Sequence, residues 1–227
     1  MEKKTYNLCF EVLKRIDQAG VLKHLVLVGS WSIYFYKYYF KDEHYSTYLR
    51  TRDIDFAVPI PPKIKDSVSI SNLIEDLGFV EIYKGKEGYL IHSHPDLSVE
   101  FIVPERGRGT NRPYNLAALG TNAQRLRFLD FLIGNTIRVD AEGMNIIVPH
   151  PAAFVLHKFL ISEKRRKKDK RDRDIEGALR VFEQLMKQGE QNTIKRMFDR
   201  MPKKWQKKMY DNLKQIGEDN IAELLIS

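Results

Sequence analysis

HLVLVGS at residues 24–30, WSIYFYKYYFK at residues 31–41 and TRDIDFAVP at residues 51–59 decide the fold of this chain. The first stretch is a short apolar run that ends at Gly29-Ser30, which predicts a buried strand leading into a tight turn. A helix is predicted to begin at Ser30. Its aromatic residues recur at helical spacing beside a core strand, so we interpret them as packing residues rather than as a platform for stacking bases.

The third stretch alternates polar and apolar residues, as a strand with one buried face does. Ile54 then faces one side, and Asp53 and Asp55 project from the other, about 6–7 Å apart along the strand. Two carboxylates repel each other unless a cation lies between them, and hard oxygen ligands suit Mg²⁺ held together with a substrate's phosphates. Gly29 would let the backbone approach a phosphate, and Ser30 would offer an amide and a hydroxyl where a helix start favours anions.

Gly29-Ser30, a helix, a connection and Asp53-Ile54-Asp55 together resemble the signature of the polymerase-β-like nucleotidyltransferase superfamily. The Arg-Thr-Arg-Asp-x-Asp pattern at residues 50–55 is similar to the AbiEii-like branch of bacterial nucleotidyltransferases. The resemblance implies that the Gly-Ser turn holds a nucleoside triphosphate. It also implies that both aspartates and a third carboxylate bind two Mg²⁺ ions, with Mn²⁺ as an alternative. The spacing from Ser30 to Asp53 is longer than in the minimal members, and a solvated strand edge is the structural alternative.

The third carboxylate is sought on the next predicted strand, DLSVEFIV at residues 96–103. Alternation puts Asp96, Ser98 and Glu100 on one side, opposite an apolar side that begins at Leu97. The resemblance places the third metal carboxylate on a strand beside the Asp-x-Asp strand, which selects Glu100, with Asp96 as the fallback. The structural alternative for Glu100 is a solvent-facing residue on a sheet edge.

Cysteine and histidine usage argues against other kinds of metal site. The chain has one cysteine, Cys9, which falls in an apolar helical pattern and is interpreted as buried core. A lone cysteine excludes an internal disulfide framework and is compatible with a reducing cytoplasm. His92 and His94 lie two apart, but no third nitrogen or sulfur ligand is near them, so we interpret both as loop residues.

Length and composition indicate a folded protein without a membrane span. The chain has 227 residues, 43% of them hydrophobic, which is enough for one sizeable domain or two small ones. Its apolar runs are shorter than the ~18–20 residues of a membrane span, and the first residues lack the apolar core of a signal peptide. We therefore expect a cytoplasmic protein. The net charge of +8 favours nucleic acid or nucleotide phosphates as partners, although it also serves solubility.

A rigid Pro149-His150-Pro151 break separates residues 1–150, the expected nucleotidyltransferase catalytic domain, from residues 151–227, an expected helical C-terminal domain. The resemblance extends loosely to this half, where it implies a lysine that contacts phosphate and an aspartate that orients it or assists the acceptor. Lys158 fits the lysine; Asp174, opening an amphipathic helix, fits the aspartate, with Asp172 as the runner-up. The structural alternatives are a snorkelling lysine and a carboxylate at a helix start.

Residues 164–173, KRRKKDKRDR, hold eight basic residues in ten. Such a run is usually a solvated face, but beside a nucleotide site it favours sequence-independent contact with RNA phosphates, which depends steeply on salt. Aromatic residues, expected of a single-strand binder, are missing within it.

The sequence thus predicts an α/β fold: a nucleotidyltransferase-like mixed, twisted sheet with flanking helices, followed by a C-terminal helical bundle. The expected activity is Mg²⁺-dependent transfer of a nucleoside monophosphate from an NTP to an acceptor hydroxyl, with release of pyrophosphate. The acceptor is an RNA or tRNA end, a protein or a small molecule. Members of the AbiEii-like branch often act as toxins, so an antitoxin protein is a candidate partner. The alternative from another class is a non-catalytic, basic RNA-binding module on a degenerate transferase fold.

Overall fold

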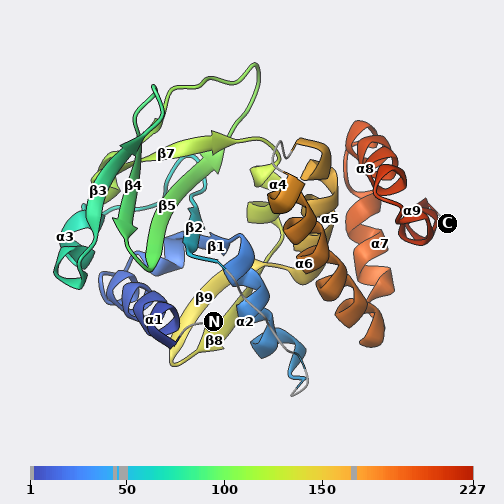
Figure 1. The fold of residues 1–227 in the computed structure, drawn as a ribbon, viewed down its shortest axis with the longest axis horizontal. Helices are drawn as coiled ribbons and strands as arrows, with labels where there is room; N and C mark the ends of the chain where they lie inside the picture. The colour runs from blue at the N-terminus through green and yellow to red at the C-terminus, as the bar shows by residue number, and fades with distance from the viewer. Residues whose placement is uncertain (1–2, 43–44, 46–50, 165–167, 227) are drawn as a thin grey trace. The chain divides into compact units, whose positions relative to one another are not determined.

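The computed structural model describes residues 3–42, 45, 51–164 and 168–226. Contacts within the chain divide it into two compact units, Met1–Pro149 and His150–Ser227. The first unit contains the strands, and the second consists of helices (Figure 1). No helix among the described residues is both long enough and apolar enough to cross a bilayer. The assignment of residues 1–150 as a catalytic domain and of residues 151–227 as a separate domain remains a prediction.

The first unit is built around a mixed seven-stranded sheet. Its central order is β1-β2-β5-β4-β3, with β7 paired to β5 and β6 paired to β7. β2 runs parallel to β5, whereas β1 is antiparallel to β2 and β4 is antiparallel to β5. The strands are β1 (Val26–Val28), β2 (Asp53–Ala57), β3 (Val80–Lys84), β4 (Tyr89–His94), β5 (Leu97–Pro104), β6 (Tyr114–Leu116) and β7 (Thr121–Leu126). A separate hairpin joins β8 (Thr136–Ala141) to β9 (Met144–Pro149).

Alternation along β2 and β5 explains why these two strands pair at the centre. Ile54 and Phe56 of β2 are fully buried, and Val99 and Phe101 of β5 are buried on the same face. The rings of Phe56 and Phe101 stack with their centroids 5.7 Å apart. Burying this apolar face fixes which residues point the other way, because a one-residue slip would turn every side chain to the opposite face. Burial of the apolar residues therefore determines which residues of β2 and β5 form the polar face.

Helices of the first unit pack their apolar stripes against the strands. They are α1 (Lys3–Gln18), α2 (Ser30–Phe40), α3 (Ile70–Ile74) and α4 (Leu129–Gly134), with 3₁₀ turns η1 (Leu22–His24), η2 (Glu75–Leu77) and η3 (Ala117–Leu119). Cys9 is buried in α1, as predicted. Trp31, Phe35 and Tyr36 of α2 are fully buried, which confirms the packing role predicted for Trp31 and Phe35. Tyr34, Tyr38 and Tyr39 are half-buried.

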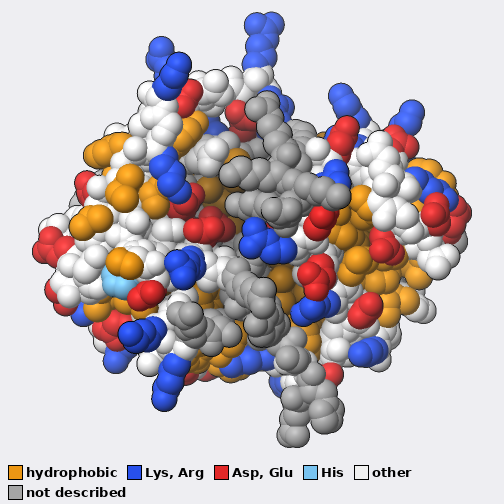
Figure 2. Space-filling view, viewed as in Figure 1, with side chains coloured by type: hydrophobic (Ala, Val, Ile, Leu, Met, Phe, Trp, Pro, Cys, Tyr) orange, Lys and Arg blue, Asp and Glu red, His pale blue; other side chains and the backbone are white. Residues whose placement is uncertain are grey.

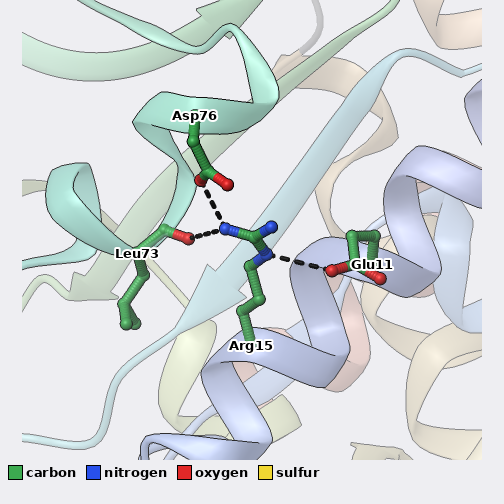
Figure 3. Close-up of polar contacts among 4 residues, drawn as sticks. All are labelled: Glu11, Arg15, Leu73 and Asp76. Carbon is green, nitrogen blue, oxygen red and sulfur yellow. Dashed lines mark hydrogen bonds and ion pairs between the residues drawn. The ribbon is translucent and has the colours of Figure 1, made fainter.

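Arg15 connects α1 to the α3–η2 segment (Figure 3). Its guanidinium donates to the carbonyl of Leu73 at 3.0 Å, pairs with Glu11 at 3.0 Å and pairs with Asp76. The hydrogen bond from Arg15 holds the pKa of Asp76 below its usual value. One side chain thus joins segments 58 to 61 residues apart in sequence.

Three local predictions differ from the structure. The sequence predicts a helix that Ser71 caps and Gly78 ends, but in the structure Ser69 caps α3: its side chain accepts from the amide of Asn72. His92 and His94 lie in β4 instead of a loop, because the two residues between His94 and Leu97 form the turn and pairing continues up to it. The Gly-, Arg- and Asn-rich composition of residues 104–122 predicts a loop, but this stretch includes β6 and the start of β7.

The second unit is a helical bundle around α5 (Pro151–Ile161), ten of whose eleven residues are buried. The other elements are η4 (Ser162–Lys164), α6 (Lys168–Lys187), α7 (Gln191–Asp199), α8 (Lys203–Gln215) and α9 (Asp219–Ile226). The buried amide of Asn212 on α8 donates to the carbonyls of Phe159 and Leu160 at 2.8 and 3.0 Å. These bonds satisfy carbonyls at the end of α5 that lack partners within the helix. The predicted mixed α/β fold with C-terminal helices is confirmed.

Candidate active site on the polar face of the sheet

The polar face of β2 and β5 brings two of the predicted carboxylates level with each other. In the parallel register, Asp55 lies opposite Glu100 and Asp53 lies opposite Ser98. Residues directly opposite in a ladder share a face, with their β-carbons about 4.5–5.5 Å apart. Asp53 is exposed, and Asp55 and Glu100 are half-buried. Three acidic residues therefore start from one face of two neighbouring strands.

The carboxylates of Asp53 and Glu100 each have a polar contact with a neighbouring side chain. The hydroxyl of Ser98 donates to Asp53 Oδ1 at 2.8 Å, and Glu100 Oε1 pairs with Lys84 Nζ at 3.3 Å. Lys84 comes from β3, two strands away, and its ammonium extends along the same face. Sequence reasoning missed both contacts. Alternation along β3 places Lys84 on this face, but the order of the strands was needed to find it.

The residue types on this face fit a divalent cation, whereas their present side-chain positions do not form a complete site. Carboxylate oxygens are the ligands that Mg²⁺ prefers in proteins. Among the residues that the structure describes, no three His, Cys, Asp or Glu side chains are grouped closely enough to hold a metal ion. The carboxylate of Glu100 contacts the ammonium of Lys84, so a metal ion would have to displace that ammonium in order to bind Glu100. Asp96, the fallback residue, lies in the turn before β5 and has its carboxylate 3.9 Å from His94 Nδ1.

The Gly-Ser corner lies directly against the second aspartate. Val28, the last residue of β1, pairs with Asp55, and Gly29 follows with φ +75° and ψ −155°. A β-carbon at residue 29 would lie 2.6 Å from Asp55 Oδ2. The backbone conformation is one that is essentially restricted to glycine. Only glycine therefore lets the chain turn this close to the carboxylate.

Ser30 is the first residue of α2, and Ser32 holds the corner in place. The hydroxyl of Ser32 donates to the carbonyl of Leu27 at 3.0 Å, and its amide donates to the carbonyl of Gly29 at 3.3 Å. The first amides of a helix have no acceptor within the helix, and the macrodipole makes this end positive. The corner thus presents amides suited to an anion beside a carboxylate face suited to a cation.

Lys158 and Asp174 belong to the second unit, where they form a buried ion pair. Lys158 Nζ lies 2.7 Å from Asp174 Oδ1, and the two side chains are 8% and 14% exposed. The ring of Phe154 packs 5.4 Å from the same ammonium. The interpretation of Lys158 as a snorkelling surface lysine is therefore wrong. Asp172, the runner-up, has a side chain 54% exposed and lies 3.7 Å from Arg171.

Asp174 does not open its helix, which corrects another expectation. The helix α6 begins at Lys168, so Asp174 lies in its second turn, beyond the end where a carboxylate meets the dipole. The last residues of the basic run, from Lys168 on, belong to the same helix. Residues 165–167 of that run lie outside the described residues.

One comparison with known proteins shows the family of this chain. The mixed sheet, the Gly-Ser corner and the acidic face define an α/β protein with a candidate site for an anion and a cation side by side. A family model described as nucleotidyltransferase matches residues 7–201, and the chain belongs to that family. Among curated proteins, none matches this chain in sequence.

Solved structures with a similar course of the chain include two of the antibiotic-resistance factor ANT(2'')-Ia. The solution structure of that protein is 13% identical in sequence to this chain. The match covers 85% of this chain and 95% of the chain of ANT(2'')-Ia, with a TM-score of 0.45. Its crystal structure in complex with adenylyl-2''-tobramycin is 13% identical and covers 76% of this chain and 86% of its own, with a TM-score of 0.46. An antigenic nucleotidyltransferase-like protein from Paracoccidioides brasiliensis is 10% identical, covers 92% of this chain and 87% of its own, and has a TM-score of 0.46.

Proposed function

We propose that this chain is a metal-dependent enzyme that transfers a nucleoside monophosphate from an NTP to an acceptor hydroxyl. The family supports transfer chemistry of this general kind. The observation that carries the proposal for these residues is the level placement of Asp55 and Glu100, with Gly29 packed against the Asp55 carboxylate. Like charges that lie directly opposite each other destabilise a sheet. A purely structural role therefore does not explain why two acidic residues lie side by side here.

Asp53, Asp55 and Glu100 are the proposed metal ligands, and Mg²⁺ is the proposed metal, with two ions expected and Mn²⁺ as an alternative. A bound divalent ion supplies positive charge that offsets the triphosphate and lowers the pKa of the acceptor hydroxyl. Asp53 and Asp55 provide two ligand groups from one strand. Glu100 provides the third when it exchanges Lys84 for the metal.

In the proposed reaction, the acceptor oxygen attacks the α-phosphorus of the NTP. The bond from that phosphorus to the oxygen bridging to the β-phosphate breaks, and pyrophosphate leaves with that oxygen. The hydroxyl proton passes to the carboxylate of Glu100, which acts as the general base. The amides of Gly29 and Ser30 bind the phosphates. Following the resemblance, Lys158 and Asp174 are the proposed phosphate-binding residues of the second unit, where Asp174 orients Lys158 through their ion pair.

The acceptor is proposed to be RNA, with a tRNA end as the first candidate. The net charge of +8 supports a polyanion over a neutral acceptor, whereas a protein side chain and a small molecule remain the other two classes. The AbiEii-like branch, a role as a toxin with an antitoxin partner, and a cytoplasmic location form part of the same proposal. They are supported by the Arg-Thr-Arg-Asp-x-Asp pattern at residues 50–55 and by the single cysteine.

Two observations favour a second candidate function. Glu100 is paired with Lys84, and the described residues contain no ready group of three metal ligands. These features fit a non-catalytic, basic RNA-binding module on a transferase fold. Calorimetry with ATP, CTP, GTP and UTP in the presence of Mg²⁺ separates the two functions. Metal-dependent binding of any NTP supports the enzyme, and binding of none of them supports the module.

The decisive experiment is label transfer by matched variants. The protein is incubated with each α-³²P-labelled NTP, Mg²⁺ and total cell lysate, and the labelled macromolecule is identified by nuclease and protease digestion. We expect Asp55→Asn to lower incorporation at least about 100-fold, because lost transition-state charge stabilisation has effects of this size. Asp66→Asn is the control, because Asp66 is an exposed aspartate outside the sheet. Undiminished incorporation by Asp55→Asn would refute the proposal.

A further inference from the structure

Nearly all of the net positive charge belongs to the second unit. Residues 150–227 carry 19 Lys and Arg against 12 Asp and Glu, whereas residues 1–149 carry 19 against 18. The net charge of +8 thus divides into +7 on the helical unit and +1 on the unit that carries the sheet. A charge excess concentrated in one part of a chain indicates an anionic macromolecular partner for that part.

A compact group of this charge lies where α7 meets α8. The group, here named the α7–α8 basic corner, comprises exposed side chains from the end of one helix and the first turns of the next: Arg196, Arg200, Lys203, Lys204 and Lys207. Figure 2 shows Lys and Arg side chains that project into solvent over the α8 end of the second unit. Asp199 and Asp211 border the corner, one on each helix. The positive residues therefore outnumber the acidic ones within it.

The arrangement of these lysines is electrostatically unfavourable for the helix itself. Lys203 and Lys207 are four residues apart, and Lys204 and Lys207 are three apart, so like charges are neighbours on one face. The first turn of α8 contains no acidic residue, although this end of a helix favours negative charge. Packing does not demand the lysines, because the buried residues of α8 are Gln206, Met209, Asn212 and Leu213. An anionic partner would relieve the repulsion that the fold leaves in place.

Part of this charge is available to a partner. Lys203 donates to Gln206 and Lys208 pairs with Glu163. Lys204 and Lys207, by contrast, make no ion pair or hydrogen bond with any other residue that the structure describes. Half-buried Trp205 lies three residues before Lys208, so its aromatic ring is next to that lysine on the surface of α8. Lysines that track a backbone next to an aromatic ring that stacks on bases are typical of single-strand binding surfaces.

We propose that the α7–α8 basic corner binds single-stranded nucleic acid through its phosphate backbone. A protein partner fits the surface less well, because protein interfaces have an apolar centre. Among the described residues of the second unit, the only large hydrophobic side chain that is exposed is Ile226, near the end of α9. The proposal does not depend on the transfer reaction. It adds a binding surface on the second unit, whereas the carboxylates of the sheet belong to the first.

The test measures binding of fluorescein-labelled 12-nucleotide oligouridylate and oligothymidylate to the full-length protein by fluorescence anisotropy, from 50 to 300 mM salt. Lys204→Gln/Lys207→Gln should raise Kd about tenfold at 100 mM salt. It should also reduce the slope of log K against log salt by about 1.4, since each phosphate contact on a single strand contributes about 0.7. Lys4→Gln/Lys14→Gln is the matched control, because both are exposed lysines of α1 in the first unit.

The control variant should bind like the wild type, and circular dichroism should show both variants folded. Equal losses in both variants would overturn the proposal, because net charge alone would then explain binding. Displacement of the oligonucleotide by an oligoglutamate of equal charge would also overturn it, in favour of an acidic protein partner. Similar Kd values for RNA and DNA support backbone recognition, and tighter RNA binding supports the proposal with RNA as the ligand.

Two further measurements make the result specific to the corner. Trp31 is fully buried, so a change in tryptophan fluorescence on binding reports on Trp205, the other tryptophan. The change should vanish in Trp205→Phe, whereas a change that persists contradicts contact at this corner. Label transfer by Asp55→Asn is assayed separately from oligonucleotide binding by Lys204→Gln/Lys207→Gln. Loss of label transfer without loss of binding therefore distinguishes failure of the reaction from failure of this surface.

Discussion

Gly29 lies so close to Asp55 that a β-carbon at residue 29 would meet Asp55 Oδ2 at 2.6 Å and displace the carboxylate. Gly29→Ala should destabilise the protein by about 1–3 kcal/mol from backbone strain alone, and the displaced carboxylate should also abolish metal-dependent NTP binding. Gly20→Ala is the control, because Gly20 has φ +72° but no atom within 4 Å of a built β-carbon. Urea unfolding and calorimetry on both variants check this. Nucleotide binding that survives in Gly29→Ala would contradict a role for this corner.

Lys84→Ala should tighten the binding of divalent cations. Lys84 neutralises Glu100 at 3.3 Å, so its removal leaves the carboxylate without that competing cation. The lysine side chain is 62% exposed, and a pair of this kind contributes only about 0–1 kcal/mol to stability, so the fold should persist. Calorimetric titration with Mn²⁺ should show a Kd several-fold lower than that of the wild type. Lys86→Ala, an exposed lysine of the following turn, should leave the Kd unchanged. Equal Kd values for all three proteins would remove Glu100 from the metal site.

Single substitutions in the ion pair of Lys158 and Asp174 should lower the free energy of unfolding more than the double substitution does. Asp174→Asn or Lys158→Met leaves one charge buried without its 2.7 Å partner and should cost about 3–5 kcal/mol. The double variant Lys158→Met/Asp174→Leu should recover most of that loss, because it buries neither charge. Arg180→Ala, which breaks an exposed pair on the same helix α6, should cost less than about 1 kcal/mol. Urea unfolding measures all four variants. A double variant as unstable as the single ones would show that the pair is not the source of the loss.

Stability should fall as the pH drops below about 6.5, the ordinary pKa of histidine. Burial lowers the pKa of His92, against an opposing effect of Glu81, and burial also lowers the pKa of His150. A group whose folded-state pKa is depressed binds more protons when unfolded, so the free energy of unfolding decreases as the pH falls through this window. His92 contacts Ser71 at 3.5 Å and Thr121 at 3.4 Å, so His92→Gln retains a polar side chain there. Unfolding in urea at pH 7.5 and 5.5 should show a smaller pH dependence in the variant. An unchanged difference would exclude His92 as a source.

The sequence predicted the elements whose signal is local. Alternation in Asp53–Ala57 and Leu97–Pro104 and the glycine after Val28 each reflect the immediate neighbours, and the structure has these strands and this corner within a residue or two of the prediction. The short strand Tyr114–Leu116 was missed, because three residues are too few to show a period, and the stretch around them is rich in glycine, arginine and asparagine.

What escaped prediction depends on partners far apart in the chain. Nothing in the residues around Glu100 indicates that β2 runs parallel to β5 or that Lys84 reaches across from β3. The cap at Ser69 instead of Ser71 depends on which hydroxyl meets the amide of Asn72, and Ser71 is engaged by Glu81 and His92. The burial of Lys158 follows from the packing of α5 at the centre of its bundle, whereas its sequence alone equally fits a surface lysine.

The parallel pairing of β2 with β5 sets a limit on how this protein can vary. Deleting one residue within β5 would bring Val99 or Phe101 beside Asp55 and turn Glu100 into the hydrophobic interior. Insertions and deletions are therefore tolerable only in the segments that connect the strands. β2 and β5 must keep their number of residues in any related sequence that preserves the carboxylate pair.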